Sequence, residues 1–450
     1  MSLDTIVAIA TASGRGAIGV VRVSGPQSHA VMQAVCGRSL RPRMATHLSF
    51  LDAQGQPMDD GLAIFFSAPN SYTGEDVLEL QGHGGPGVLA LVLKRCCAVD
   101  GVRLAQPGEF TQRAFLNDKL DLAQAESVAD LIDAGSERAA RSAVASLQGR
   151  FSALVQELLS QLIECRLRVE ACLDFPEEDI EFIEREGVRE KLEAMTALLI
   201  TIQQAAQRGA ALRDGLRVVL VGAPNVGKSS LLNALAEQEV ALVTDIAGTT
   251  RDRIVQEILI DGVPMHVIDT AGLRPTHDVV ERLGIERTWK EVETAQVVVL
   301  MEDASGTIPT DKALEQDVLK RVSSVRSVIR VWNKSDLSPG ATDSATAKEV
   351  IRISAKTGAG LEHLRDRLLQ LAGWSGDAST GVFSARARHL NALDRARSQL
   401  NEAGHHLKDQ ELELLAECLR QAQQALSEIT GEFSSDDLLG EIFSHFCIGK

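Results

Sequence analysis

The hydrophobic positions in the central part of the chain come in short continuous runs, the pattern of strands buried on both faces of a sheet. The first run, Leu216–Val221, is rich in β-branched residues and precedes a segment, 230–236, that favours a helix. Similar runs follow at 266–268, 328–332 and 350–353. Strands that alternate with helices predict a parallel, doubly wound α/β sheet.

Two neighbouring runs, 254–260 and 263 onward, are separated only by Asp261 and Gly262. Residues of these types tolerate the left-handed backbone that a tight hairpin turn requires. The segment is therefore predicted to be a β-hairpin whose second strand ends near Asp269.

Apolar residues spaced by three or four positions predict amphipathic helices on both sides of this α/β segment. The pattern begins at Leu120, breaks at Phe175–Ile180 and returns after residue 376. We interpret 119–213 and 376–450 as two parts of one helical domain, interrupted by a domain inserted over 214–375. The stripe before the break contains Leu147, Phe151, Leu154, Leu158, Leu162, Cys165, Val169 and Cys172, so its cysteines are expected in the core.

Residues 1–118 have a different hydrophobic pattern, which predicts short strands mixed with helices. Strands are predicted at 5–10, within 14–25 after a turn, at 61–66 and at 76–80, and a helix over 87–97. This order predicts a small α+β domain.

Composition sets bounds on the class of protein. The chain has 450 residues, of which 44% are hydrophobic and 24% charged, as in ordinary globular proteins. We expect neither a membrane span, because no apolar run is long enough, nor a secretory leader, and the seven cysteines lack metal spacing. We expect a cytoplasmic protein. The net charge of −16 repels phosphate backbones, so an RNA substrate would need a local basic patch or a partner protein.

The residues Gly222–Ser229 match the phosphate-binding pattern G-x-x-x-x-G-K-[ST] between a predicted strand and a predicted helix. The N–H groups of such a loop wrap a phosphate, and the helix N-terminus adds positive potential. Lys228 can reach the β- and γ-phosphates of a nucleotide, and the Ser229 hydroxyl can hold Mg²⁺. The motif therefore predicts a nucleotide site.

Three more motifs each follow a predicted strand, at the sheet edge where doubly wound folds bind ligands. Asp269–Gly272 offers a carboxylate to the Mg²⁺ shell and an N–H to the γ-phosphate. Asn333–Asp336 resembles the motif N-K-x-D, whose carboxylate accepts two N–H bonds that guanine offers and adenine does not. Ser354–Lys356 resembles the motif whose backbone contacts guanine O6. Together they predict a Ras-like guanine-nucleotide-binding domain over 214–375.

Leu273 occupies the position after D-T-A-G where Ras-like enzymes carry a glutamine that orients water. Leucine cannot polarise water, so hydrolysis is either slow or assisted by another residue. Residues 244–252 are typical of an effector loop, in which Thr250 is a candidate second Mg²⁺ ligand. Asn225 adds an amide that most phosphate loops do not need.

Asn225, the segment 244–252, the run D-T-A-G-L-R and the pattern V-E-x-x-G-I-x-R at 280–287 resemble bacterial tRNA-modification GTPases of the MnmE (TrmE) type. The resemblance implies G domains that pair across their nucleotide faces around a potassium ion. The side chain of Asn225 would bind potassium with backbone oxygens of Thr244, Ile246 and Thr249, and the cation would offset charge as an arginine finger does. Glu281 matches the family's catalytic glutamate, which positions the water; the alternative is an ordinary solvated carboxylate on a helix face.

The resemblance and the motifs together assign one set of residues to GTP binding, and they give Glu281 and Lys228 as catalytic residues. The set is Asn225, Val226, Gly227, Lys228, Ser229, Ser230, Thr244, Asp245, Ile246, Ala247, Gly248, Thr249, Thr250, Asp269, Thr270, Ala271, Gly272, Asn333, Lys334, Asp336, Ser354, Ala355 and Lys356.

The N-terminal runs at 72–76, 80–85, 106–115 and 119–126 resemble the family's folate-binding fold. That fold binds 5-formyltetrahydrofolate as a one-carbon donor or its mimic. By motif position Arg22, Glu79 and Lys119 would hold the folate, with the carboxylate on the pterin edge and the cations on the formyl or glutamate oxygens. Strand alternation also allows Glu79 to face solvent.

The tail Cys447–Lys450 resembles the family's closing C-[ILV]-G-K. The resemblance places it near the folate pocket, with Lys450 as a folate contact and Cys447 as an exposed thiol that is a candidate for covalent chemistry. The alternative is a tail that only packs. A prenylation box is excluded, because nothing upstream is polybasic and lysine is a poor final residue for it.

The resemblance covers essentially the whole chain. It implies a homodimeric, potassium-dependent GTPase that works with a flavin-dependent partner of the GidA/MnmG type in a heterotetramer or larger assembly. The pair would add an aminomethyl-type group at C5 of U34 in certain tRNAs, with GTP hydrolysis driving conformational change. A ribosome-assembly GTPase and a folate-dependent transferase with a regulatory G domain stay as alternatives. The first should carry a KH-like appendage, and the sequence shows no G-x-x-G clamp with basic flanks.

Overall fold

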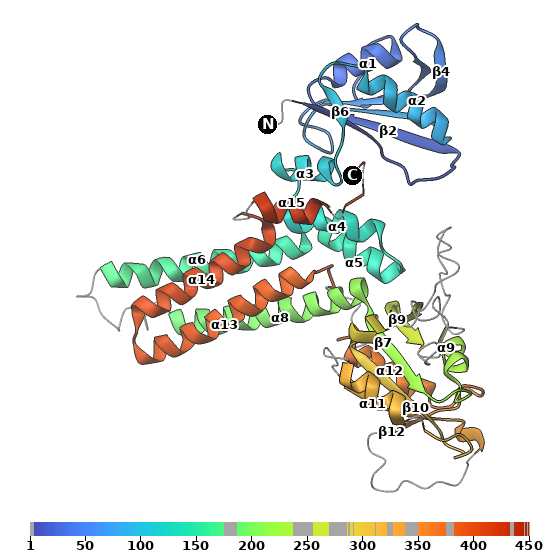
Figure 1. Ribbon diagram of the computed structural model, residues 1–450. Helices are drawn as coiled ribbons and strands as arrows, with labels where there is room; N and C mark the ends of the chain where they lie inside the picture. The colour runs from blue at the N-terminus through green and yellow to red at the C-terminus, as the bar shows by residue number, and fades with distance from the viewer. Residues whose placement is uncertain are drawn as a thin grey trace. The chain divides into compact units, whose positions relative to one another are not determined.

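The computed structural model separates into two compact units, each with its own sheet and helices (Figure 1). The first unit contains 1–129, 147–192 and 398–450, and the second contains 130–146 and 193–397. The structure describes residues 4–174, 187–236, 255–269, 286, 289–290, 292–310, 312–321, 327–337, 350–374, 382–432, 436–444, 446–447 and 449.

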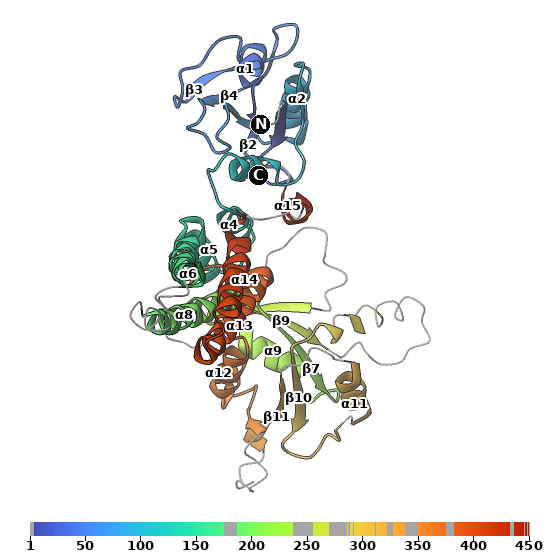
Figure 2. The ribbon, with the colours of Figure 1, turned by 90° about the vertical axis from the view of Figure 1, so that its left-hand side faces the viewer.

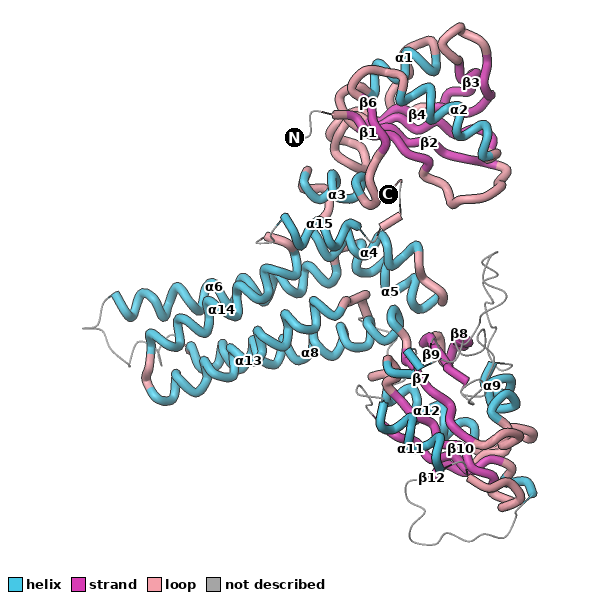
Figure 3. The backbone as a smooth tube through the Cα atoms, viewed as in Figure 1, coloured by secondary structure: helices cyan, strands magenta, loops and turns pink. Residues whose placement is uncertain are grey.

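The sheet of the first unit is antiparallel except for one edge strand, and two helices, α1 (Ser28–Cys36) and α2 (Pro86–Cys97), cover one face (Figure 3). Alternate strand residues such as Val21 and Val23 point into this apolar layer, because successive side chains of a strand face opposite sides. The predicted α+β fold is confirmed. The strand order is β3 (Thr46–Leu51), β4 (Pro57–Phe66), β5 (Val77–His83), β2 (Ile18–Ser24), β1 (Thr5–Ile9) and β6 (Val102–Leu104).

The helices of the first unit pack along their predicted apolar stripes. In α6 (Arg150–Asp174) the buried stripe includes Phe151, and burial raises the pKa of the Cys165 thiol to about 11. This helix lies along α14 (Leu412–Thr430), where the Arg166 guanidinium donates to Gln423 at 2.6 Å. Three shorter helices are α3 (Glu109–Leu116), α4 (Leu122–Ile132) and α15 (Asp436–Ser444), and the last two share an apolar cluster.

The apolar stripe predicted from Leu147 to Cys172 differs from the structure at its first and last residues. One helix, α5 (Glu137–Leu147), ends at Leu147, and α6 starts three residues later because Gly149 interrupts the chain with a left-handed φ of +81°. Cys172 is only half-buried. Periodicity alone cannot detect a helix break that leaves the apolar spacing intact.

The sheet of the second unit is parallel except for its final hairpin (Figure 2). Its apolar strands bury both faces. One face packs against α9 (Lys228–Ala236) and α12 (Leu361–Leu371), and the other against α11 (Lys312–Arg321). The predicted doubly wound architecture is confirmed. The strand order is β12 (Val350–Arg352), β11 (Ser327–Asn333), β10 (Val297–Asp303), β7 (Leu216–Gly222), β9 (Val263–Asp269) and β8 (Val255–Ile260).

The two ends of this α/β region meet at one buried carboxylate. Asp130 accepts hydrogen bonds from Arg213 Nε and Arg386 Nη2, both at 2.8 Å, and from the Ser384 hydroxyl. Arg213 is at the end of α8 (Val188–Asp214), just before β7, and Arg386 immediately precedes α13 (Ala387–Asp409). Asp130 therefore holds the two ends of the α/β region next to each other.

Gly209 in α8 provides a stability test, because a Cβ added there would lie 1.8 Å from the Phe383 carbonyl oxygen. We expect Gly209→Ala to destabilise the second unit by at least about 2 kcal/mol, which lowers its apparent melting temperature by roughly 4–8 °C. Gly404→Ala in α13 is the control, since nothing lies within 4 Å of its added Cβ. Scanning calorimetry of both variants decides the point: equal melting temperatures would contradict this packing.

Candidate guanine-nucleotide site

The phosphate loop connects β7 to α9, as its motif predicts. Lys228 begins α9 and is buried; its ammonium donates to the carbonyl oxygens of Gly222 at 2.9 Å and Ala223 at 3.3 Å. Asn225 has a left-handed φ of +61° and is exposed, and Ser229 is exposed in the first turn of α9. The loop thus places a cation, an amide and a hydroxyl around its helix N-terminus.

Asn333, the last residue of β11, joins two of the predicted loops. Its side-chain Nδ2 donates to the Val226 carbonyl oxygen at 2.8 Å, and its Oδ1 accepts from the Ala355 N–H at 3.0 Å. The side chain is buried, with 2% of the residue exposed. A Cβ at Gly227 would come within 2.2 Å of Nδ2, so the phosphate loop approaches this amide as closely as glycine permits.

The guanine-recognition loops are linked by a second contact. The Ser354 hydroxyl donates to Asp336 Oδ1 at 2.7 Å, while the Asp336 side chain stays exposed. Lys356 is exposed beside it. The structure therefore brings the predicted N-K-x-D and S-A-K motifs together next to the phosphate loop, at the carboxyl ends of β11, β12 and β7.

Asp303, at the tip of β10, belongs to the same edge but is not among the residues predicted from the sequence. Its side chain is fully buried and receives the Lys334 ammonium at 3.2 Å, and Lys334 has a φ of +61°. Burial raises the pKa of Asp303, but hydrogen bonds from Ser305 and Lys334 outweigh it and hold the pKa below its usual value. The available signal was its place at the end of the apolar run 297–301, which matches that of Asp269.

Several predicted residues of the nucleotide site lie outside the described residues. Asp269 ends β9, but its side chain is not described. The residues outside the described ranges are Thr244, Asp245, Ile246, Ala247, Gly248, Thr249, Thr250, Thr270, Ala271, Gly272, Leu273 and Glu281.

The predicted folate residues Arg22 and Glu79 are direct partners across β2 and β5. Arg22 Nη2 lies 2.9 Å from Glu79 Oε1, and less than a fifth of either side chain is exposed. Glu79 is therefore not the solvent-facing carboxylate that strand alternation allowed. The Arg22 guanidinium also lies 5.5 Å from the ring centroid of Tyr72 and 5.8 Å from that of Phe110.

The C-terminal tail reaches this pair. Arg22 Nη1 donates to the Gly449 carbonyl oxygen at 3.4 Å. The Gly108 N–H donates to the Cys447 carbonyl oxygen, also at 3.4 Å. Cys447 is exposed, and Lys450 lies outside the described residues. Lys119 is exposed as well, and its ammonium donates to the Pro69 carbonyl oxygen at 3.0 Å. The tail thus both packs and borders the predicted site.

The fold and the joined loops define a P-loop protein that binds guanine nucleotides. The chain matches two family models, "GTP-binding protein TrmE N-terminus" over residues 5–119 and "MnmE helical domain" over 122–447. It is 54% identical to the tRNA modification GTPase MnmE of Polaromonas sp. and 56% identical to that of Bordetella avium, with 99% of each chain covered in both cases. The chain belongs to the MnmE family, and it is a GTP hydrolase that acts in tRNA modification.

Solved structures resemble a part of the chain. The G domain of FeoB from Methanococcus jannaschii is 23% identical, with 35% of this chain and 97% of that chain covered and a TM-score of 0.26. A variant of Era from Aquifex aeolicus bound to GDP and AlF4⁻ is 28% identical, with 41% of this chain and 66% of that chain covered and a TM-score of 0.27. None of the helices in the described ranges combines the length and apolar character that a bilayer crossing requires.

Proposed function

We propose that the chain is a potassium-dependent GTPase that, with a flavin-dependent partner of the GidA/MnmG type, modifies C5 of the wobble uridine U34 of certain tRNAs. The added group is of the aminomethyl type, and a folate derivative supplies its carbon. The observation that carries the proposal is the coexistence, in one chain of this family, of the joined guanine-nucleotide loops and the Arg22–Glu79 site.

The described residues fit Mg²⁺–GTP. Lys228 would leave the loop carbonyls for the β- and γ-phosphates, which would lie at the N-terminus of α9 near its backbone N–H groups. The Ser229 hydroxyl, exposed in that first turn, would bind Mg²⁺ together with Thr250. The exposed Asp336 carboxylate would accept the two guanine N–H groups, while Ser354 fixes its orientation from the other side.

Asn225 fits a role toward potassium, because its exposed amide sits on the surface of the phosphate loop. Its oxygen would join backbone oxygens of Thr244, Ile246 and Thr249 in a cage between two paired G domains. A cation held there would stabilise charge that develops on the transferred phosphoryl group, and Glu281 would position the attacking water.

The Arg22–Glu79 pair fits a folate. Both polar contacts between Arg22 and Glu79 involve Oε1 of the carboxylate, and in the described part of the chain Oε2 accepts no hydrogen bond. Oε2 can therefore accept from a pterin ring that packs near Tyr72, while the guanidinium meets an acidic or formyl oxygen. Lys119 and Lys450 would supply further cations, and the exposed Cys447 thiol is the candidate for covalent chemistry.

We also propose four segments: a folate-binding and dimerisation domain (1–118), a helical domain in two parts (119–213 and 376–450) and the G domain (214–375). The convergence of Arg213 and Arg386 on Asp130 supports the insertion. The N-terminal domains would hold a constant homodimer, and the nucleotide state would open and close the G-domain pair.

Analysis of modified nucleosides tests the proposed function. A bacterial strain without its own MnmE is complemented with this chain or with its Glu281→Ala variant, and hydrolysed tRNA is analysed by mass spectrometry. We expect the chain to restore C5-modified wobble uridines and the variant to restore less than about a tenth of them, because hydrolysis drives the cycle. Wobble uridines that are unchanged by the deletion, or by complementation, would contradict the proposal.

Potassium dependence is tested by GTP turnover in potassium and sodium salts of equal ionic strength. We expect turnover to be at least about tenfold faster in potassium, because a cation held there would stabilise charge that develops in the transition state. Asn225→Gly should abolish the difference and preserve GTP binding, because glycine removes the amide and accepts the left-handed φ of +61°. Equal wild-type rates in the two salts would remove the cation from the mechanism.

A further inference from the structure

The tight turn between β8 and β9 is held by residues from two other segments of the second unit. Arg138, in the first turn of α5, pairs with Asp261 Oδ1 at 2.9 Å. The indole Nε1 of Trp374, shortly after α12, donates to Asp261 Oδ2 at 2.9 Å. One carboxylate at the hairpin turn therefore binds α5 through Arg138 and the segment that follows α12 through Trp374.

Two further contacts fix the position of the turn. The Ser136 hydroxyl donates to the Gly262 carbonyl oxygen at 2.8 Å, and the Arg138 guanidinium lies 5.4 Å from the Trp374 ring centroid. Gly262 has a φ of +76°, and a Cβ there would meet Arg138 Cδ at 2.9 Å. We call Ser136, Arg138, Asp261, Gly262 and Trp374 the hairpin clamp.

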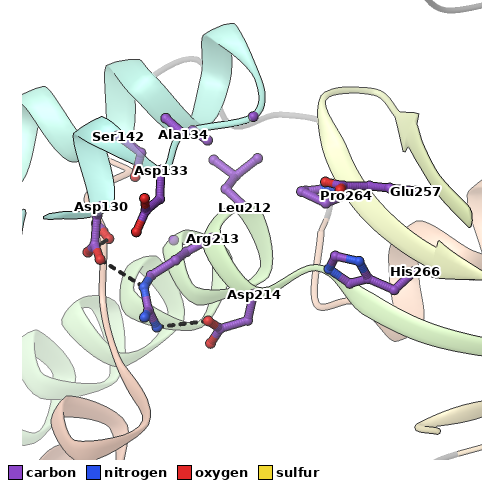
Figure 4. Close-up of a pocket in the computed structure, with 14 residues that line it drawn as sticks. Asp130, Asp133, Ala134, Ser142, Leu212, Arg213, Asp214, Glu257, Pro264 and His266 are labelled. Atoms are coloured by element: carbon purple, nitrogen blue, oxygen red, sulfur yellow. Dashed lines mark hydrogen bonds and ion pairs between the residues drawn. The ribbon is translucent and has the colours of Figure 1, made fainter. Parts of the chain in front are cut away.

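Beside the hairpin clamp the junction is polar and incompletely filled. A cavity of about 150 Å³ separates the strand residues Glu257 and His266 from Asp133 and the end of α8 (Figure 4). In the same view Arg213 bridges Asp130 and Asp214. Such a junction can change its arrangement without exposing an apolar core, so directed polar contacts hold the hairpin against α5.

Strand β9 connects the hairpin clamp to the nucleotide site. It begins right after Gly262 and ends at Asp269, the first residue of the D-T-A-G motif, about 20 Å away at the usual rise of a strand. It is paired with β7, which leads into the phosphate loop, with Leu220 opposite Asp269. A shift of β9 at one end therefore moves the other end.

We propose that Arg138 and Asp261 are positioning residues. They transmit the conformational change that accompanies GTP hydrolysis from Asp269, along β9, to α5. The inference rests on the proposed function, in which hydrolysis drives a conformational change. Neither residue lies at the carboxyl edge of the sheet, so neither acts on GTP directly. Loss of the ion pair uncouples the two activities: hydrolysis continues, and tRNA modification fails.

The test uses the full chain in three conservative single variants and one double variant. Asp261→Asn keeps a side chain that tolerates the left-handed φ of +52° and can still accept from Trp374, while it loses the charge that Arg138 needs. Arg138→Gln removes the other partner. The matched control is Arg141→Gln on the same helix, since within the described part of the chain Arg141 pairs only with Glu137 and both side chains are more than three-quarters exposed.

We expect the Asp261→Asn and Arg138→Gln variants to hydrolyse GTP within about twofold of the wild-type rate. In the complemented strain, the level of modified wobble uridine should be at least about fivefold lower than with the wild-type chain. The double variant should be no worse than either single variant, because the two residues act as one unit. The control should retain both activities.

Full modification by both clamp variants would overturn the proposal. So would a parallel loss of hydrolysis and modification with a lower melting temperature, since this is the signature of a merely structural role. If the wild-type chain itself does not restore modification in the strain, the proposed function fails, and this outcome is separate from any result for the clamp.

Discussion

The buried amide of Asn333 is the interaction on which the nucleotide site depends. Parallel strands deliver the motif loops to one sheet edge, but strand geometry alone leaves each loop free to adopt its own conformation. The amide donates to the phosphate loop at Val226 and accepts from the guanine loop at Ala355. Because both backbone groups would otherwise lose a partner in a buried region, phosphate binding and base recognition are built as one structure.

The same logic applies where chain segments converge elsewhere. Asp130 accepts hydrogen bonds from Arg213 and Arg386, which lie at the two ends of the α/β region. At the hairpin turn, Asp261 pairs with Arg138 and accepts a hydrogen bond from Trp374. Single carboxylates with several donors thus set the geometry of the second unit, and the buried Asp130 is costly to leave unpaired.

Local patterns predicted the elements well, and long-range partners poorly. The motif Gly222–Ser229, the parallel strands and the Asp261–Gly262 turn follow from residue type and spacing, which are local properties. Asp303 escaped detection because its role depends on Lys334, which is far away in sequence. The break at Gly149 was missed because it preserves the apolar period. The pairing of Arg22 with Glu79 required the strand register, which the alternation of a single strand does not specify.

The formal charge of −16 limits how a tRNA-modifying protein can hold its substrate. Several of its arginines, such as Arg22, Arg113 and Arg386, are largely buried against carboxylates and cannot meet phosphates. The tRNA backbone is therefore expected to contact a local basic surface or a partner protein.

The most direct test of the account is the dissociation constant of GDP for Asn333→Ala, measured by calorimetric titration beside Lys312→Ala, an exposed residue of α11. Removal of the amide orphans the Val226 carbonyl and the Ala355 N–H, each worth about 1–3 kcal/mol, so the account predicts affinity at least about tenfold weaker than in the control. Affinities of the two variants within twofold of each other would contradict the claim that this amide assembles the guanine-nucleotide pocket.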